Sequence, residues 1–234
     1  NITDKDIIKK INNQLKGSKI DVLLGGPPCQ SFSSLGRAKD ENSMKYDKRN
    51  YLFESYEKIL NYFKPKIFLF ENVTGLLTTK LKGKKIINTI KHKLGKNYKI
   101  SKKIDKMILN SCEYGVPQMR KRVFLIGIRK DISFDIEKIF TYLKKSHYTP
   151  ICTKKERRNK KKYLTVRDAI ADLPALKPGQ GKKITNLVIK KRNNYLKKIR
   201  SKKNSELFDH VARTHNNIDI KRFREMSKNK WTFE

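Results

Sequence analysis

A cysteine stands in a stiff turn close to the start of the chain. Residues 25–33 read Gly-Gly-Pro-Pro-Cys-Gln-Ser-Phe-Ser and follow the run Asp21-Val-Leu-Leu24. Two glycines let a strand end through conformations closed to other residues, and two prolines fix φ, so Cys29 is held on rigid backbone. Inward-pointing N–H groups or a nearby cation would favour its thiolate, the reactive form. The alternative is a buried, inert thiol, the commonest fate of a lone cysteine. The tripeptide Pro-Pro-Cys alone leaves both open.

The longer string around the cysteine decides between them. GGPPCQSFS resembles the catalytic motif of the C5 cytosine DNA methyltransferases, whose cysteine adds to C6 of a cytosine. Residues 68–73, FLFENV, resemble the Glu-Asn-Val motif of that family, and residues 114–122, YGVPQMRKR, resemble its Gln-x-Arg-x-Arg motif. Between the first two of these motifs, residues 49–53 resemble the start of the helix that follows the family's mobile catalytic loop. Three motifs in family order are far more specific than any one of them.

The resemblance implies a role for four side chains. Cys29 would be the nucleophile, and Glu71 would assist at N3 of the ring, which requires a carboxyl group that is partly protonated or can relay a proton. Arg120 would hold the O2 edge of the cytosine, and Arg122 would brace the catalytic loop. Without this context, Glu71 would be read as a capping or salt-bridging carboxylate, and the arginines as partners of surface carboxylates. Two neighbours have supporting roles, Asn72 as a brace of the turn and Gln118 as a structural residue.

The same resemblance implies cofactor and DNA contacts. The methyl donor would be S-adenosylmethionine, and Pro28 and Leu52 match positions where the family's backbone meets it. The target atom cannot be reached inside a duplex, so the cytosine must be flipped out. Candidates for contacts to phosphates or to the resulting gap are Gln30, Ser33, Arg37 and Arg49.

The elements that must position these residues alternate between helix and strand. Apolar spacing and punctuation predict helices at 4–15, 51–63 and 83–94, and strands at 20–24, 66–70, 98–109 (one or a pair) and 122–128. This indicates an α/β fold with a mainly parallel sheet, Rossmann-like by the resemblance. Cys29 follows one strand and Glu71 ends the next, so both should emerge at one edge of the sheet.

The expected domain is incomplete at both ends. Residues 1–20 contain no Phe-x-Gly-x-Gly string, whereas the family's glycine-containing cofactor loop normally precedes the Pro-Pro-Cys turn. The family's closing elements are also not found before Glu234. We therefore expect a partial catalytic domain at 1–135 and, at 136–234, a basic segment leading into a partial target recognition domain. Within the second part, 133–146 is a candidate helix, 151–163 is turn-like, and 164–173 is a short amphipathic helix.

Composition points to an anionic partner. Lysine and arginine number 57 against 22 acidic residues, a net charge of +35, which favours salt-sensitive association with double-stranded DNA. Charge clusters at 154–162 and 190–203, although such runs can also be solvated loops or reflect genome base composition. The three cysteines have no metal-ligand or disulfide pattern, and no membrane segment is evident, so we expect no metal, no membrane and a cytoplasmic location in a bacterium.

We interpret the chain as the central part of a bacterial DNA cytosine C5 methyltransferase of a restriction-modification system, incomplete by itself. Three alternatives remain. The chain could be a natural split subunit that needs a complementing chain, or a basic DNA-binding fragment without catalysis. It could also be an RNA-methylating relative, since that branch shares Pro-Pro-Cys, but the flanking Gly-Gly and Ser-Phe-Ser resemble the DNA branch more closely.

Overall fold

The computed structural model describes residues 2–28, 51–81, 83–187, 193–200 and 206–229. The chain divides into two compact units, Asn1–Tyr163 and Leu164–Glu234. The boundary expected at residue 135 therefore lies inside the first unit. The reason is that Ile136 and Phe140, which follow residue 135, are buried in the core of the first unit.

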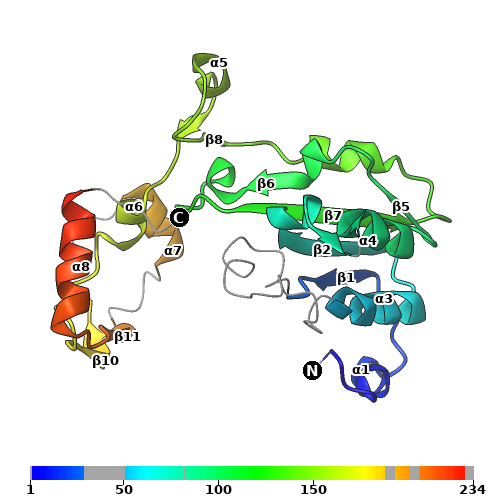
Figure 1. Ribbon diagram of the computed structural model, residues 1–234, viewed down its shortest axis with the longest axis horizontal. Coiled ribbons are helices and arrows are strands. Elements are labelled where there is room, and N and C mark those ends of the chain that lie inside the picture. The colour runs from blue at the N-terminus through cyan, green and yellow to red at the C-terminus, as the bar shows by residue number, and fades with distance from the viewer. Residues whose placement is uncertain (1, 29–50, 82, 188–192, 201–205, 230–234) are drawn as a thin grey trace. The chain divides into compact units, whose positions relative to one another are not determined.

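The first unit is built on a mixed sheet (Figure 1). Its strands are β1 (Val22–Gly25), β2 (Ile67–Val73), β5 (Tyr98–Ile100), β6 (Ile108–Asn110) and β7 (Lys121–Arg129), in the order β1-β2-β7-β5 with β6 also on β7. β1 and β2 pair in parallel, and β7 is antiparallel to β2, β5 and β6. The other strands thus share one direction, which confirms the predicted α/β class with mainly parallel strands. The reversed β7 was not predicted.

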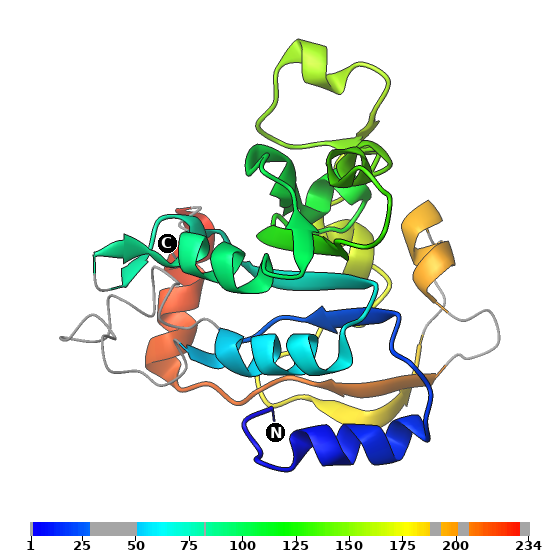
Figure 2. The same cartoon turned by 90° about the vertical axis from the view of Figure 1, so that its right-hand side faces the viewer.

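Helix α3 (Leu52–Phe63) covers one face of this sheet and contacts α4 (Ile86–Leu94). Strand β2 alternates in burial, with Phe68, Phe70 and Asn72 turned to the α3 side. Tyr56 of α3 packs edge-on against both phenylalanines, with ring centroids 6.3 and 5.3 Å apart. Burial of one such aromatic side chain contributes about 1.5 to 3 kcal/mol to folding. A third helix, α1 (Ile7–Leu15), lies beside α3 (Figure 2), and Asn12 donates to the Tyr62 hydroxyl at 2.9 Å.

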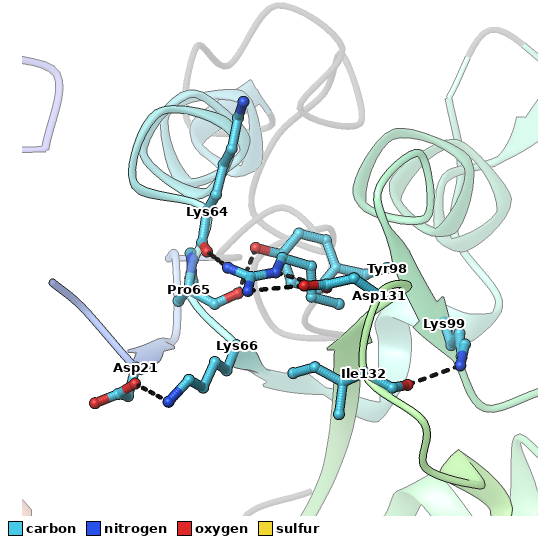
Figure 3. Close-up of polar contacts among 9 residues, drawn as sticks. Asp21, Lys64, Pro65, Lys66, Tyr98, Lys99, Asp131 and Ile132 are labelled. Atoms are coloured by element: carbon cyan, nitrogen blue, oxygen red, sulfur yellow. Dashed lines mark hydrogen bonds and ion pairs between the residues drawn. The ribbon is translucent and has the colours of Figure 1, made fainter.

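Polar contacts fasten the edge of the sheet where β1 and β2 begin (Figure 3). The Tyr98 hydroxyl donates to the carbonyl of Pro65 at 2.8 Å, and Lys66 pairs with Asp21 at 2.8 Å. Arg129, at the end of β7, donates to the carbonyl that closes α3. These contacts fix the ends of neighbouring elements. The carboxyl ends of β1 and β2, at the other side of the sheet, are therefore held by a rigid framework.

Shorter elements join the strands, and two depart from expectation. They are η3 (Thr74–Leu77), β3 (Lys80–Leu81), β4 (Lys84–Lys85), η4 (Asp105–Met107), η5 (Ser111–Tyr114), η6 (Ile136–Thr141), β8 (His147–Tyr148), α5 (Lys154–Arg157) and β9 (Lys161–Lys162). The helix expected from residue 83 begins at Ile86, because residues 84–85 pair with β3. The helix expected at 133–146 is wrong, since only the 3-10 turn η6 forms there. It buries just Ile136 and Phe140, which is too little apolar surface for a longer amphipathic helix.

The second unit contains α6 (Val166–Ile170), β10 (Gly181–Asn186), α7 (Asn194–Ile199), β11 (Glu206–Val211) and α8 (Asn217–Lys228). The short helix expected at 164–173 is confirmed, and β10 and β11 form an antiparallel ribbon. Asp172, whose side chain is 1% exposed, accepts two hydrogen bonds of 3.0 Å from Arg200, which also donates to the carbonyl of Ala169. This buried pair clamps the end of α6 to α7.

Candidate active site at the end of β1 and β2

An ion pair crosses from β2 to β7 at the edge where the Pro-Pro-Cys turn begins. Nε of Arg122 lies 3.0 Å from Oε1 of Glu71, and their side chains are 20% and 33% exposed. Strand register produces this contact. Glu71 is opposite Phe124 and Val73 is opposite Arg122, so the two charged residues are diagonal neighbours on one face, within reach of long side chains. A carboxyl group is thereby held on the face of the sheet that α3 does not cover.

The two glycines of the turn serve opposite faces of the sheet. A Cβ atom on Gly25 would lie 2.6 Å from the Tyr56 ring, on the α3 side. A Cβ atom on Gly26 would lie 2.9 Å from Oε2 of Glu71, on the other side. Real Cβ atoms do not approach so closely, so glycine at each position lets a neighbouring side chain pack against bare backbone. The Glu71 carboxylate therefore rests directly on the turn that leads to Cys29.

Asn72 ties the same turn to β2. Its side chain is buried, and Nδ2 donates to the carbonyl of Pro27 at 3.2 Å while Oδ1 accepts from the N–H of Val73 at 2.8 Å. The predicted role of Asn72 as a brace of the turn is confirmed. The motif Glu-Asn-Val thus combines a partly exposed carboxyl group with a buried amide that fixes the backbone beside it.

Tyr56 of α3 connects strands β1 and β2 on the face of the sheet that this helix covers. Its hydroxyl lies 3.2 Å from the carbonyl oxygens of Leu23 in β1 and Leu69 in β2, and donates to them. Burial raises the pKa of Tyr56 well above its ordinary value, because desolvation disfavours the phenolate. The hydroxyl therefore stays protonated and remains a donor between β1 and β2.

The Gln-x-Arg-x-Arg segment is fastened to the end of β6. Oδ1 of Asn110, a buried side chain, accepts from the backbone N–H of Arg120 at 3.1 Å, and the N–H of Ser111 donates to the Arg120 carbonyl at 3.0 Å. The Ser111 hydroxyl donates to the carbonyl of Gln118 at 2.5 Å. Arg120 itself is exposed. The backbone of Arg120 is therefore fixed while its side chain is exposed. The Gln118 carbonyl takes part in holding this segment to β6, which is a structural contact.

Sequence reasoning missed Asn110 altogether. The available signal was a single amide that closes the apolar run Met107-Ile-Leu-Asn110 directly before the motif. A buried amide side chain needs hydrogen-bond partners, and here the partner is the backbone of a candidate catalytic arginine. Such a contact joins residues that are ten positions apart, so it could not be read from either segment alone.

The remaining predicted residues are placed as follows. Pro28 is exposed at the end of the turn, and Leu52 is half-buried as the first residue of α3. Cys29 lies outside the described residues, and so do the predicted DNA contacts Gln30, Ser33, Arg37 and Arg49.

The other two cysteines have no active-site character. Cys112 is buried, and burial raises the pKa of its thiol. Cys152 is half-buried, and its Sγ accepts from Nε of Arg157 at 3.4 Å. Within the described ranges, no group of three or more His, Cys, Asp and Glu side chains is arranged to hold a metal ion. The described helices also include none that is long and apolar enough to cross a bilayer.

The sequence pattern of the C-5 cytosine-specific DNA methylases matches residues 1–233, nearly the whole chain. The chain belongs to this family. The Glu71–Arg122 pair and the turn braced by Asn72 thus lie in a methylase domain. They are formed by the motifs that resembled this family in the sequence.

Two of the most similar curated relatives are bacterial proteins. The chain is similar to the Type II methyltransferase M.Bpa9945I of Bacillus paralicheniformis, with 39% identity over 183 residues, 75% of the chain and 38% of the relative. It is also 33% identical to the Type II methyltransferase M.DdeI of Desulfomicrobium norvegicum over 206 residues, 88% of the chain and 45% of that protein. The chain thus spans less than half the length of these two relatives.

A solved structure supports the fold. The crystal structure of a candidate DNA modification methyltransferase encoded within an E. coli prophage superposes with a TM-score of 0.62 at 23% identity, covering 92% of this chain and 58% of that one. At this identity the similarity concerns the fold, and it agrees with the methyltransferase-type α/β sheet expected from the motifs.

Proposed function

We propose that this chain forms part of a DNA (cytosine-5-)-methyltransferase of a restriction-modification system. The protein would transfer a methyl group from S-adenosylmethionine to C5 of a flipped cytosine through a covalent bond between Cys29 and C6. One observation carries the proposal. The carboxyl group of Glu71, oriented by Arg122 at 3.0 Å, lies against Gly26 in the turn that leads to Cys29, in a chain of the C5 methylase family.

The chemistry needs both groups because C6 of cytosine is a weak electrophile. In the proposed step, the Cys29 thiolate forms the Sγ–C6 bond as the Glu71 carboxyl group relays a proton from water to N3, where negative charge would otherwise develop. C5 then has enamine character. After C5 has gained the methyl group, the C5 proton passes to water, the Sγ–C6 bond breaks and the N3 proton returns to Glu71, which restores the aromatic ring and frees the thiolate.

S-adenosylmethionine would supply an electrophilic methyl group at C5 when bound. The residues present fit a partial site for it. Pro28, three residues after β1, is exposed, and Leu24 within that strand is 68% exposed, so both offer apolar surface for the adenosine part of the cofactor. Leu52 would add a backbone contact at the start of α3.

The exposed Arg120 would hold the O2 edge of the flipped base. Its fixed backbone supports this role, because a guanidinium group on a rigid strand end reaches a carbonyl oxygen with little loss of conformational freedom. Gln30, Ser33, Arg37 and Arg49 remain the proposed contacts to phosphates and to the gap left by the base. Action on bacterial DNA would place the protein in the cytoplasm.

A second candidate is a split or inactive form that binds DNA and needs a complementing chain for transfer. Within the described residues, β1 is the last strand of its sheet, and its apolar side chains Val22 and Leu24 are 49% and 68% exposed, which favours a second chain packing on them. The chain also covers less than half of the two relatives named above. The RNA-methylating alternative has no comparable support.

The test uses the full-length protein that contains this sequence, with labelled S-adenosylmethionine and duplex DNA. We expect label at C5 of cytosine, no transfer by Cys29→Ser, and DNA binding by that variant close to the unchanged protein. DNA with 5-fluorocytosine should trap a covalent complex that survives denaturation, because the fluorine at C5 cannot leave as a proton does. Full activity of Cys29→Ser would remove the nucleophile assignment. Binding without transfer, restored by a second chain, would favour the split form.

A further inference from the structure

Residues 144–163 concentrate positive charge on the first unit, and we call this segment the basic arm. It holds seven lysines and two arginines against one acid, Glu156. The carboxylate of Glu156 accepts from Thr153 in a capping box at the start of α5. Lys145 pairs with Glu113 outside the arm at 2.8 Å. Exposed cations of the arm are Lys144, Lys145, Lys154, Lys155, Arg157, Arg158, Lys161 and Lys162.

The arm is a closed loop with internal packing. Its two ends pair as the short parallel ladder of β8 and β9, where Tyr148 is opposite Lys162. The Tyr148 and Tyr163 rings meet edge to face with centroids 6.2 Å apart, and the guanidinium group of Arg157 lies 5.4 Å from the Tyr148 ring centre. Figure 1 shows α5 at the far end of the arm, away from the sheet. The charges are therefore carried on an ordered projection.

The base of the arm is fixed to the turn that precedes the Gln-x-Arg-x-Arg segment. The N–H of Ser146 donates to the Glu113 carbonyl at 3.0 Å. A Cβ atom on Gly115 would lie 2.8 Å from Cε1 of His147, so this glycine lets the imidazole ring rest on the turn. Gly115 stands five residues before Arg120. The arm is therefore attached to the turn at residues 113–115, which leads directly into the segment with the candidate catalytic arginines.

We infer that the basic arm clamps the phosphate backbone of duplex DNA beside the flipped base. This rests on the proposed function and adds a binding surface to it. Twelve residues, 149–160, lie between β8 and β9, so the loop can reach at most about 20 Å from its base. Phosphates of one strand follow each other at about 3.4 Å along the duplex axis. The arm thus spans several phosphates, and its lysines and arginines would hold the duplex in register without reading bases.

The test is the salt dependence of DNA binding by the full-length protein. In the triple variant Lys154→Ala, Lys155→Ala, Arg158→Ala, each lost phosphate contact should lower the slope of log Kd against log salt by about 0.9, or about 2 to 3 in all. Kd at about 0.1 M salt should weaken at least about tenfold, equally for target and non-target duplexes.

Two matched variants separate this role from net charge and from folding. Lys5→Ala, Lys9→Ala, Lys58→Ala removes the same charge from exposed positions on and beside α1 and α3, and should leave the salt slope within about 1 of the original. Lys154→Arg, Lys155→Arg, Arg158→Lys keeps the charge and should bind like the unchanged protein. An arm variant with the original Kd and slope would overturn the inference. An equal loss of DNA affinity in the Lys5, Lys9 and Lys58 control would overturn it too. So would a parallel assay in which the arm variant loses affinity for duplex RNA but not for duplex DNA. Absence of methyl transfer by the unchanged protein would instead count against the proposed function, because the binding assay needs no turnover.

Discussion

Gly26→Ala should impair methyl transfer while leaving the fold almost intact. The new Cβ atom would lie 2.9 Å from Oε2 of Glu71, about 0.5 Å inside an ordinary contact of about 3.4 Å. The carboxyl group is the movable end of a side chain, so it is displaced before the backbone is. A misplacement of about 1 Å in an active site can cost about 100-fold in rate, so we expect kcat to fall about tenfold. Stability should change by less than about 1 kcal/mol.

The assay is single-turnover methyl transfer by the full-length protein at saturating DNA, beside thermal unfolding. A double-mutant cycle with Glu71→Gln shows whether the effect passes through the carboxyl group, because coupled sites are not additive. We expect Gly26→Ala to add less than about twofold to the loss caused by Glu71→Gln. The reasoning is refuted by an unchanged kcat, or by two losses that multiply fully in the double variant.

The remaining predictions concern the fold and the support of Arg120. Gly127→Ala makes the same chemical change in the core, where the new Cβ would lie 2.0 Å from a buried aromatic ring, so thermal unfolding should show a loss of about 1 to 3 kcal/mol. Asn110→Ala should lower kcat more than it lowers DNA affinity, and Asn110→Asp, which keeps an acceptor for the Arg120 N–H, should recover much of the loss; equal recovery by a bulky apolar residue would contradict this. Arg200→Met removes two hydrogen bonds to the buried Asp172 carboxylate and should destabilise the second unit by about 1.5 to 3 kcal/mol in denaturant titrations. Burial raises the pKa of Tyr98 to about 12. A raised folded-state pKa means that this contribution is complete below the unfolded pKa of about 10 and lost as pH rises through about 12, so the stability of Tyr98→Phe should fall less over that range.

Local patterns identified the strands and helices that carry the motifs. Strand β1 ends at Gly25 and α3 runs from Leu52 to Phe63, within a residue or two of the predicted bounds, because apolar periodicity and Gly-Pro punctuation are local properties. The bracing role of Asn72 was also predicted correctly. Weak patterns failed where burial was decided by distant residues, as in the expected helix at 133–146, where only a 3-10 turn packs on the core.

The sequence by itself determined the family, the α/β class and the order of the catalytic motifs, because these depend on residue types at short spacing. Tertiary structure alone decided which of those residues meet. The reversed β7 beside β2 brings Arg122 diagonally opposite Glu71, yet a strand has the same alternation in either direction, so neither its direction nor its register was readable. The contacts of Asn110 with Arg120, and of His147 with the turn at Gly115, likewise join segments that are brought together only when long-range strand pairing is complete.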